Sequence, residues 1–332
     1  MGECRSLWFN APRSLEIRSG ALPAPGPGQV LVRTSFSGIS GGTEMLAYRG
    51  ELDPQMAIDE TIGSLGGTFQ YPFTYGYSCV GTVGQSRSAD IAEGAVVFAF
   101  HPHQDEFVIA GSDVLVLGSV DPRQATMFPL VETALQISLD AGPVFGETVA
   151  VFGLGTVGLL TSLMLQRAGA YPLGVDLAAW RRDAAIDLGI EAVGPEVLSD
   201  VLRDRGLSAG IGLAIEVSGN PEALRSALGI LAHEGQVLVA SWYGTKDVAL
   251  PLGAEFHRRR LTIRSTQVST IPARSSHRWT TARRRDTVVD LLGDLPLDRL
   301  ATHTIPFSAA ADAFSAIDAG LDGLIHVALG YQ

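Results

Sequence analysis

The chain has 332 residues, 46% of them hydrophobic and 18% charged, and a net charge of −11. This length is ordinary for two globular domains, and no apolar run approaches the roughly 20 residues that a membrane span needs. The acidic balance argues against nucleic acid as a partner. The N-terminus lacks the basic and apolar segments of a signal peptide, and two cysteines cannot form a disulfide framework. We therefore expect a cytoplasmic protein with no membrane partner.

Residues 1 to about 118 have the pattern of short strands separated by turns. The segment QVLVRTSFSG, Gln29 to Gly38, alternates and is rich in β-branched residues, which predicts a strand. The segments GYSCVGTVG and GAVVFAFHPH repeat this pattern. This part of the sequence predicts a mostly β domain with barrel-like closure.

The pattern then changes to alternating helices and strands. Apolar residues at helical spacing predict a helix from Met127 to Gly142. A strand, a glycine turn, an apolar helix and a second strand follow in ETVAVFGLGTVGLLTSLMLQRAGAYPLGVD, and LTIRSTQ at Leu261 to Gln267 is the last expected strand. Alternating β and α elements predict a doubly wound parallel sheet, so the fold class is α/β. An arginine-rich stretch, a helix in TVVDLLGDL and a final β-rich tail close the chain.

The segment VAVFGLGTVG carries glycines in the spacing of a dinucleotide-binding loop: Gly153, Gly155 and Gly158. The spacing alone is a weak signal, but here it follows an apolar strand and opens an apolar helix. The first glycine permits a tight turn, the second lets the backbone approach a pyrophosphate, and the third allows close packing of helix and strand. The helix N-terminus, with Thr156 and Val157 in its first turn, then offers N–H groups to phosphates.

An acidic residue, Asp176, ends the next expected strand. A carboxylate there can accept hydrogen bonds from the ribose hydroxyls of the cofactor and repels a 2′-phosphate. The sequence therefore favours NAD, although the nearby Arg181 and Arg182 leave NADP open.

The order of these parts resembles the medium-chain dehydrogenase/reductase family, which includes alcohol and sorbitol dehydrogenases. The resemblance spans nearly the whole chain, through PGPGQVLVRTSFSGIS, PFTYGYSCVGTV, the glycine loop and LATHTIPFSAAADAF. It implies a GroES-like catalytic domain, residues 1–122 and 273–332, and a Rossmann domain, residues 123–272. It also implies a homodimer, and contacts of Ser218 and Trp242 with the cofactor, with Trp242 or Tyr243 lining the substrate pocket.

The resemblance fails at the zinc ligands of this family. Zinc members have G-I-C-G-T-D where this chain has Gly38 to Glu44, GISGGTE, and G-H-E where it has Gly76-Tyr77-Ser78. The third ligand position falls near Glu132. One candidate ligand of three cannot hold a tetrahedral zinc, so we expect no metal. The sequences of the first two segments are most similar to those of the zinc-free branch of the family near bacteriochlorophyllide dehydrogenase.

Without zinc, side chains must polarise a carbonyl group or move a proton. The candidates in the former zinc segments are Thr43, Glu44, Tyr77 and Glu132, of which Thr43 and Glu132 are the preferred pair. Each has a structural alternative: Tyr77 can simply fill the zinc cavity, and either glutamate can pair with Arg49 or with backbone N–H groups.

Two histidines in FAFHPHQDEF, His101 and His103, are reserve candidates for proton transfer. If they lay on a strand, their rings would share one face, yet no third metal ligand is evident. Basic stretches at His257 to Arg260 and at Arg274 to Arg285 suggest either a solvated face or a clamp for an anionic substrate.

These features predict an oxidoreductase that transfers a hydride between NAD and a secondary alcohol or ketone of a small molecule. One alternative is an enone or quinone reductase that uses NADPH, because hydride addition to a conjugated carbon needs less Lewis acidity. A second alternative is a nucleotide-binding protein without turnover.

Overall fold

The computed structural model describes residues 2–331, which divide into two compact units. One unit is Met1–Pro129 with Val289–Gln332, and the other is Leu130–Val288. Residues 123–129, expected in the Rossmann domain, lie in the first unit, and residues 273–288, expected in the catalytic domain, lie in the second. The domain boundaries at 122 and 273 stay a prediction.

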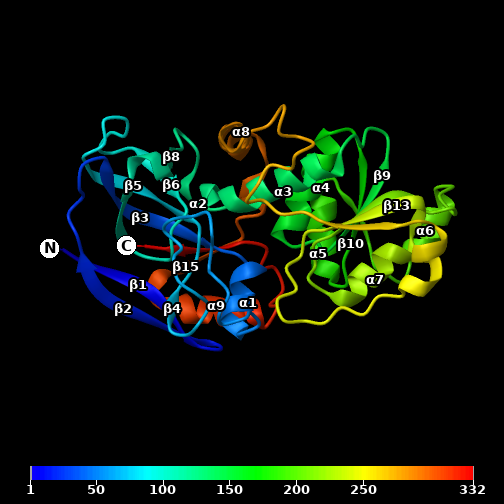
Figure 1. Cartoon of the computed structure of the whole chain (residues 1–332), viewed down its shortest axis with the longest axis horizontal. Helices are drawn as coiled ribbons and strands as arrows, with labels where there is room; N and C mark the ends of the chain where they lie inside the picture. The colour runs from blue at the N-terminus through cyan, green and yellow to red at the C-terminus, as the bar shows by residue number, and fades with distance from the viewer. Residues whose placement is uncertain (1, 332) are drawn as a thin grey trace. The chain divides into compact units, whose positions relative to one another are not determined.

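The second unit is a parallel sheet in the order β11-β10-β9-β12-β13-β14, with helices on both faces (Figure 1). Each neighbouring pair of its strands is parallel, as alternating strands and crossover helices require. Its strands are β9 (Thr148–Phe152), β10 (Tyr171–Val175), β11 (Glu191–Val193), β12 (Ile211–Glu216), β13 (Leu231–Val239) and β14 (Thr262–Ser265). Its helices are α3 (Phe128–Ala141), α4 (Thr156–Arg167), α5 (Ala179–Asp187), α6 (Leu198–Asp204), α7 (Pro221–Gly229), the π-helical turn η2 (Leu252–Phe256) and α8 (Thr281–Asp294). This strand order, read from either edge, is that of a doubly wound dinucleotide-binding fold, which confirms the predicted α/β class.

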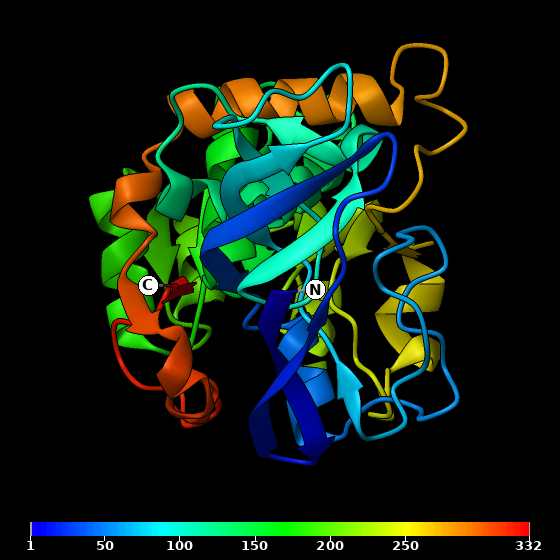
Figure 2. The same cartoon turned by 90° about the vertical axis from the view of Figure 1, so that its left-hand side faces the viewer.

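The first unit is mostly β, and both ends of the chain lie in it (Figure 2). One sheet has the order β2-β1-β4, and the other runs β15-β16-β3-β5-β6-β8 with β7 also paired to β3. Its strands are β1 (Gly2–Ala11), β2 (Ser14–Leu22), β3 (Gln29–Ile39), β4 (Phe73–Thr74), β5 (Cys79–Ser86), β6 (Val96–Ala99), β7 (Glu106–Ala110), β8 (Val114–Val116), β15 (His303–Pro306) and β16 (Val327–Gly330). Its helices are α1 (Thr43–Arg49), α2 (Pro122–Ala125) and α9 (Ala310–Asp318), with short turns η1 (Gly111–Asp113), η3 (Leu297–Arg299) and η4 (Phe307–Ala309).

The C-terminal tail joins the first unit, as the resemblance implied. Strand β16 pairs antiparallel with β3, and Val327 lies opposite Ile39. Among residues 2–331, however, the strand pairings start at β15, end at β8 and branch at β3, so they form no closed barrel. An aromatic core between the hairpin β1–β2 and α9 includes Phe9, Phe73 and Phe314.

Candidate functional site

The loop between β9 and α4 requires glycine at two of its three glycine positions. Gly153 has a φ of +101°, and a Cβ there would lie 2.7 Å from the Cα of Ser218. A Cβ on Gly158 would lie 1.8 Å from the carbonyl oxygen of Gly153. At Gly155, by contrast, a Cβ meets nothing within 4 Å. The loop is thus closed against β12 and α4 but open at Gly155, where a pyrophosphate would approach the backbone.

Asp176, directly after β10, lies beside this loop. Its Oδ2 accepts a hydrogen bond from the Leu154 N–H at 2.8 Å, and its Oδ1 accepts one from the Ala178 N–H at 2.9 Å. A nitrogen of Arg181 is 3.7 Å from the same carboxylate, and its guanidinium stacks on Trp180. The carboxylate therefore connects the glycine loop to the start of α5, and each oxygen keeps a lone pair for a ribose hydroxyl.

The ends of β12 and β13 add a buried carboxylate that the sequence did not single out. Glu216 is fully buried, and its Oε1 accepts hydrogen bonds from the N–H and hydroxyl of Ser218 at 2.7 and 2.6 Å. Its Oε2 accepts the Tyr243 hydroxyl at 2.7 Å. Burial, together with this hydrogen bond to Glu216, raises the pKa of Tyr243. Trp242, next to it, is 39% exposed.

A cluster of hydroxyl groups occupies the former zinc segments of the first unit. The side chains of Ser40 and Thr43 lie close to the Tyr77 hydroxyl, near enough to lower its pKa. Burial raises the pKa of Tyr77 far above its usual value, and the charge of Glu44 raises it further. The phenol is therefore protonated at neutral pH and acts as a hydrogen-bond donor. Thr43 and Tyr77 are only half-buried, so a substrate can reach them.

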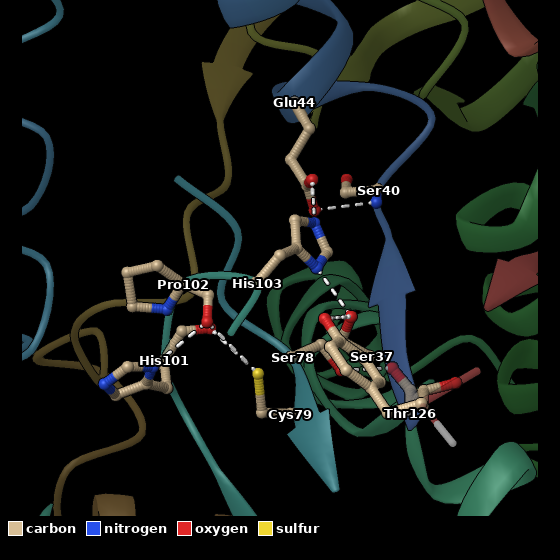
Figure 3. Close-up of polar contacts among 10 residues, drawn as sticks. Ser37, Ser40, Glu44, Ser78, Cys79, His101, Pro102, His103 and Thr126 are labelled. Carbon is tan, nitrogen blue, oxygen red and sulfur yellow. Dashed lines mark hydrogen bonds and ion pairs between the residues drawn. The ribbon is translucent and has the colours of Figure 1, made fainter. Parts of the chain in front are cut away.

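Beneath this cluster lies a buried pair, Glu44 and His103. Both side chains are fully buried, and Glu44 Oε2 is 2.8 Å from His103 Nε2. Glu44 Oε1 accepts the backbone N–H of Ser40 at 2.9 Å, and Figure 3 shows the imidazole between Glu44 and Ser37. Gly76 makes room for the ring: its φ is +111°, and a Cβ there would be 2.6 Å from His103 Cδ2. The structure thus brings Glu44, His103, Thr43 and Tyr77 together.

The other histidine is separate from this group. His101 stacks on Phe107 with ring centroids 3.8 Å apart, and its Nδ1 is 3.0 Å from the carbonyl oxygen of Pro102. Burial lowers the pKa of His101 to about 4. Both histidines lie in the loop between β6 and β7 and not on a strand, so the condition for a shared face is not met. Figure 3 shows them in different surroundings.

Glu132 belongs to the second unit and is bound by arginine. Its Oε1 is 3.0 Å from Nε of Arg284, whose side chain is only 2% exposed. The other nitrogens of Arg284 donate to Gln136 Oε1 and to the Val268 carbonyl, both at 2.6 Å. Arg49, which the sequence offered as an ion-pair partner for Glu44 or Glu132, pairs with Asp318 instead.

These side chains do not fit a zinc ion. The positions that carry ligands in zinc members hold a serine or glycine at 40 and 41, a tyrosine at 77 and the ion-paired Glu132. Zinc prefers thiolate, imidazole or carboxylate ligands in a tetrahedron. Across residues 2–331, no three His, Cys, Asp or Glu side chains are grouped so that they could hold a metal.

The sequence is similar to those of several known dehydrogenases. The model of the family described as zinc-binding dehydrogenase matches residues 156–285. L-threonine 3-dehydrogenase of Saccharopolyspora erythraea is 33% identical over 122 residues, which cover 36% of this chain and 35% of that protein. D-guloside 3-dehydrogenase of Escherichia coli is 25% identical over 86% of this chain and 88% of its own length. The 2-desacetyl-2-hydroxyethyl bacteriochlorophyllide A dehydrogenase of Cereibacter sphaeroides is 26% identical over 92% of each chain.

Solved structures show the same fold. An alcohol dehydrogenase of Escherichia coli complexed with NADH has a TM-score of 0.78 at 18% identity and covers 99% of each chain. A zinc-binding dehydrogenase of Sinorhizobium meliloti bound to NADP has a TM-score of 0.78 at 20% identity and covers 99% of this chain and 100% of that one. The chain is thus similar to the zinc-binding dehydrogenase family over residues 156–285, and to dehydrogenases over most of its length, in line with the resemblance to the medium-chain dehydrogenases/reductases. It is an NAD(P)-dependent oxidoreductase of alcohol and ketone groups, as the sequence predicted.

Proposed function

We propose that this enzyme transfers a hydride between NAD and a secondary alcohol or ketone of a small molecule without zinc. The observation that carries the proposal is the hydroxyl cluster of Ser40, Thr43 and Tyr77, which stands where zinc members place their ligands. A protonated phenol there can donate to a substrate oxygen, which is one task of a Lewis acid.

The bound nicotinamide would supply the hydride chemistry. The N–H groups at the start of α4 would bind its pyrophosphate, and Asp176 its adenosine ribose. Tyr77 and Thr43 would hold the substrate oxygen, and Tyr77 Oη would donate a hydrogen bond that strengthens as negative charge grows on that oxygen. Glu44 and His103 lie beneath them and are shielded from solvent. Glu132, with Oε1 already bound to Arg284, is less favoured as a proton acceptor than the sequence suggested.

NAD is the proposed cofactor, because the Asp176 carboxylate lies at the glycine loop. Arg181 is close enough to that carboxylate to pair with it, so NADP remains the alternative if Asp176 is neutralised by this arginine.

An enone or quinone reductase remains the second candidate function. It is favoured by the lack of a zinc-type ligand set, because a phenol polarises a carbonyl less than a metal ion does. Parallel assays with ketones and with the matching enones separate the two. A nucleotide-binding protein without turnover is not supported, because the relatives are dehydrogenases.

The remaining expectations concern substrate charge, assembly and location. Several arginines proposed to clamp an anionic substrate are paired within their own unit: Arg260 with Glu234, Arg274 with Asp140 and Arg284 with Glu132. An anionic substrate, a homodimer and a cytoplasmic location stay predictions. Within residues 2–331, no helix is long and apolar enough to cross a membrane.

The test is a panel of alcohols, ketones and enones with the variants Tyr77→Phe and Thr43→Val, alongside Glu132→Gln. We expect at least one of the first two to lose ~100- to 10,000-fold in kcat, the usual contribution of a proton-handling group, with little change in NADH affinity. Tyr71→Phe is the control, because it removes a partly buried hydroxyl that donates to the Ala47 carbonyl. Normal turnover by both Tyr77→Phe and Thr43→Val would place the catalytic group elsewhere.

A further inference from the structure

Four side chains form a continuous row of hydrogen bonds in the first unit. Tyr331 Oη is 2.8 Å from Ser37 Oγ, Ser37 Oγ is 2.7 Å from His103 Nδ1, and His103 Nε2 is 2.8 Å from Glu44 Oε2. Ser37, His103 and Glu44 are fully buried. The four come from the C-terminal end, β3, the loop after β6 and α1, so the row connects segments far apart in the sequence. Figure 3 shows its three buried members, Ser37, His103 and Glu44.

The groups at the two ends of the row determine which atom donates and which accepts in each of its hydrogen bonds. Within residues 2–331, the Tyr331 hydroxyl has Ser37 as its hydrogen-bond partner. Burial raises the pKa of Tyr331 well above its usual value, so the phenol keeps its proton and must donate it to Ser37. The Ser37 hydroxyl then donates to His103 Nδ1, and the remaining hydrogen of a neutral imidazole lies on Nε2, facing Glu44.

The reverse direction leaves one hydrogen of the row without an acceptor. If Nδ1 carried a hydrogen, Ser37 would accept it and would donate to Tyr331. The hydroxyl hydrogen of the partly buried Tyr331 would then have no acceptor in the row, at the cost of a hydrogen bond. The forward direction satisfies every group, because a carboxylate at Glu44 accepts both His103 Nε2–H and Ser40 N–H.

We propose that Ser37 and Tyr331 are positioning residues of this enzyme: they lock His103 in its Nε2–H tautomer and so hold Glu44 as the carboxylate that fixes Ser40. This inference rests on the proposed function at one point, the role of the hydroxyl cluster. Ser40 donates its N–H to Glu44, and its side chain lies close to the Tyr77 hydroxyl. The row therefore sets the orientation of the Tyr77 hydroxyl.

The same row also connects the two segments that supply ligands in zinc members. Glu44 and Ser40 belong to one of them, and His103 packs against Gly76 of the other. A metal joins such segments through its ligands, whereas here a buried carboxylate–imidazole pair lies between them.

Nitrogen NMR of the full chain labelled with ¹⁵N-histidine tests the tautomer directly. The seven histidines give seven ring patterns, and the His103→Gln variant identifies the one to follow. We expect Nε2 of His103 to carry a hydrogen and Nδ1 to carry none. In Ser37→Ala this pattern should change or broaden, because Nδ1 loses its donor. A His103 ring with hydrogens on both nitrogens, or on Nδ1 alone, overturns the proposal.

Kinetics distinguish positioning from mere packing. We expect Ser37→Ala and Tyr331→Phe each to lower kcat by roughly tenfold, the equivalent of one hydrogen bond of about 1.4 kcal/mol, with KM for NADH unchanged. The double variant should lose no more than either single one. The control Tyr71→Phe should keep its kcat at a similar loss of thermal stability.

If both variants keep kcat while losing stability as Tyr71→Phe does, the row is structural and the proposal fails. If the wild-type enzyme turns over no alcohol, ketone or enone, the proposed function fails instead, and the NMR result still decides the tautomer.

Discussion

Replacing Asp176 by alanine should reverse or abolish the cofactor preference. The carboxylate accepts two backbone N–H groups, from Leu154 in the glycine loop and from Ala178 at the start of α5. By the proposed function it also accepts ribose hydroxyls. Asp176→Ala therefore removes the proposed charged hydrogen bond to NAD and frees the N–H of Leu154 in the same loop.

The expected size follows from these contacts. A hydrogen bond to a charged group contributes about 1.5–3 kcal/mol, which corresponds to roughly 10- to 100-fold in the dissociation constant of NADH. For NADPH the change has the opposite sign, because the repulsion of the 2′-phosphate disappears. Arg181, now 3.7 Å from the carboxylate, becomes available to pair with the phosphate. The ratio of the two affinities should thus move by at least about tenfold toward NADPH.

Titration of NADH and NADPH by fluorescence or calorimetry measures both constants on the same folded sample. Asp183→Ala is the matched control, because it removes one exposed carboxylate from the same helix, α5. A wild-type enzyme that binds NADPH more tightly than NADH refutes the assignment of Asp176. An equal change of the ratio in Asp183→Ala would show that only overall charge matters.

Three further outcomes are expected. Elemental analysis of the purified enzyme should find no stoichiometric zinc, and one zinc per chain with activity lost to a chelator would contradict the zinc-independent mechanism. Light scattering should give twice the mass of one chain, and a monomer at micromolar concentration would exclude the dimer. Stability should fall on acidification, because burial holds the pKa of His326 at about 4 against about 6.5 in the unfolded chain. The unfolded chain then binds the extra proton, so the contribution of His326 is nearly complete at pH 7 and falls by about 2 kcal/mol between pH 7 and pH 5. The buried His101, whose pKa is also lowered to about 4, adds a fall of about the same size. Urea unfolding of the wild type and of His326→Gln checks this, since the variant should lack the His326 part of the pH dependence.

The fold was predictable because its signals are local. A glycine loop between a strand and a helix, followed by alternating elements, is enough to predict the parallel sheet, and the strand from Gln29 matches β3 closely. The arginine-rich stretch was harder to interpret. Residues from Thr281 belong to α8, and Arg284 lies buried because Glu132 and Gln136 receive its hydrogen bonds. Charge pattern alone predicts a solvated face there, and only the tertiary partner reverses it.

The site was predictable only where a motif carries it. Asp176 and the glycines follow from spacing, and Thr43, Glu44 and Tyr77 follow from the missing zinc ligands. Ser37 and Tyr331 have no such signal, since a serine in a strand and a tyrosine at the C-terminal end occur in any β domain. They meet at His103 through strand pairing between β3 and β16, which no local pattern reveals. The hydrogen bond between Tyr243 and Glu216 was not predicted for the same reason, because it joins segments that follow two neighbouring strands.

The absence of a zinc-type ligand set also bears on the substrate. A hydroxyl donor stabilises a developing negative charge by about 3–4 kcal/mol, and the buried Glu44 carboxylate opposes such a charge nearby. This pair of effects favours substrates whose oxygen needs little stabilisation, such as alcohols next to a conjugated system or enones that delocalise the charge onto carbon. The ranking of saturated against conjugated substrates in the panel is therefore the measurement that separates the two candidate functions. It does so without identifying the natural substrate, because it depends only on the electrostatics of the hydroxyl cluster and of the carboxylate beneath it.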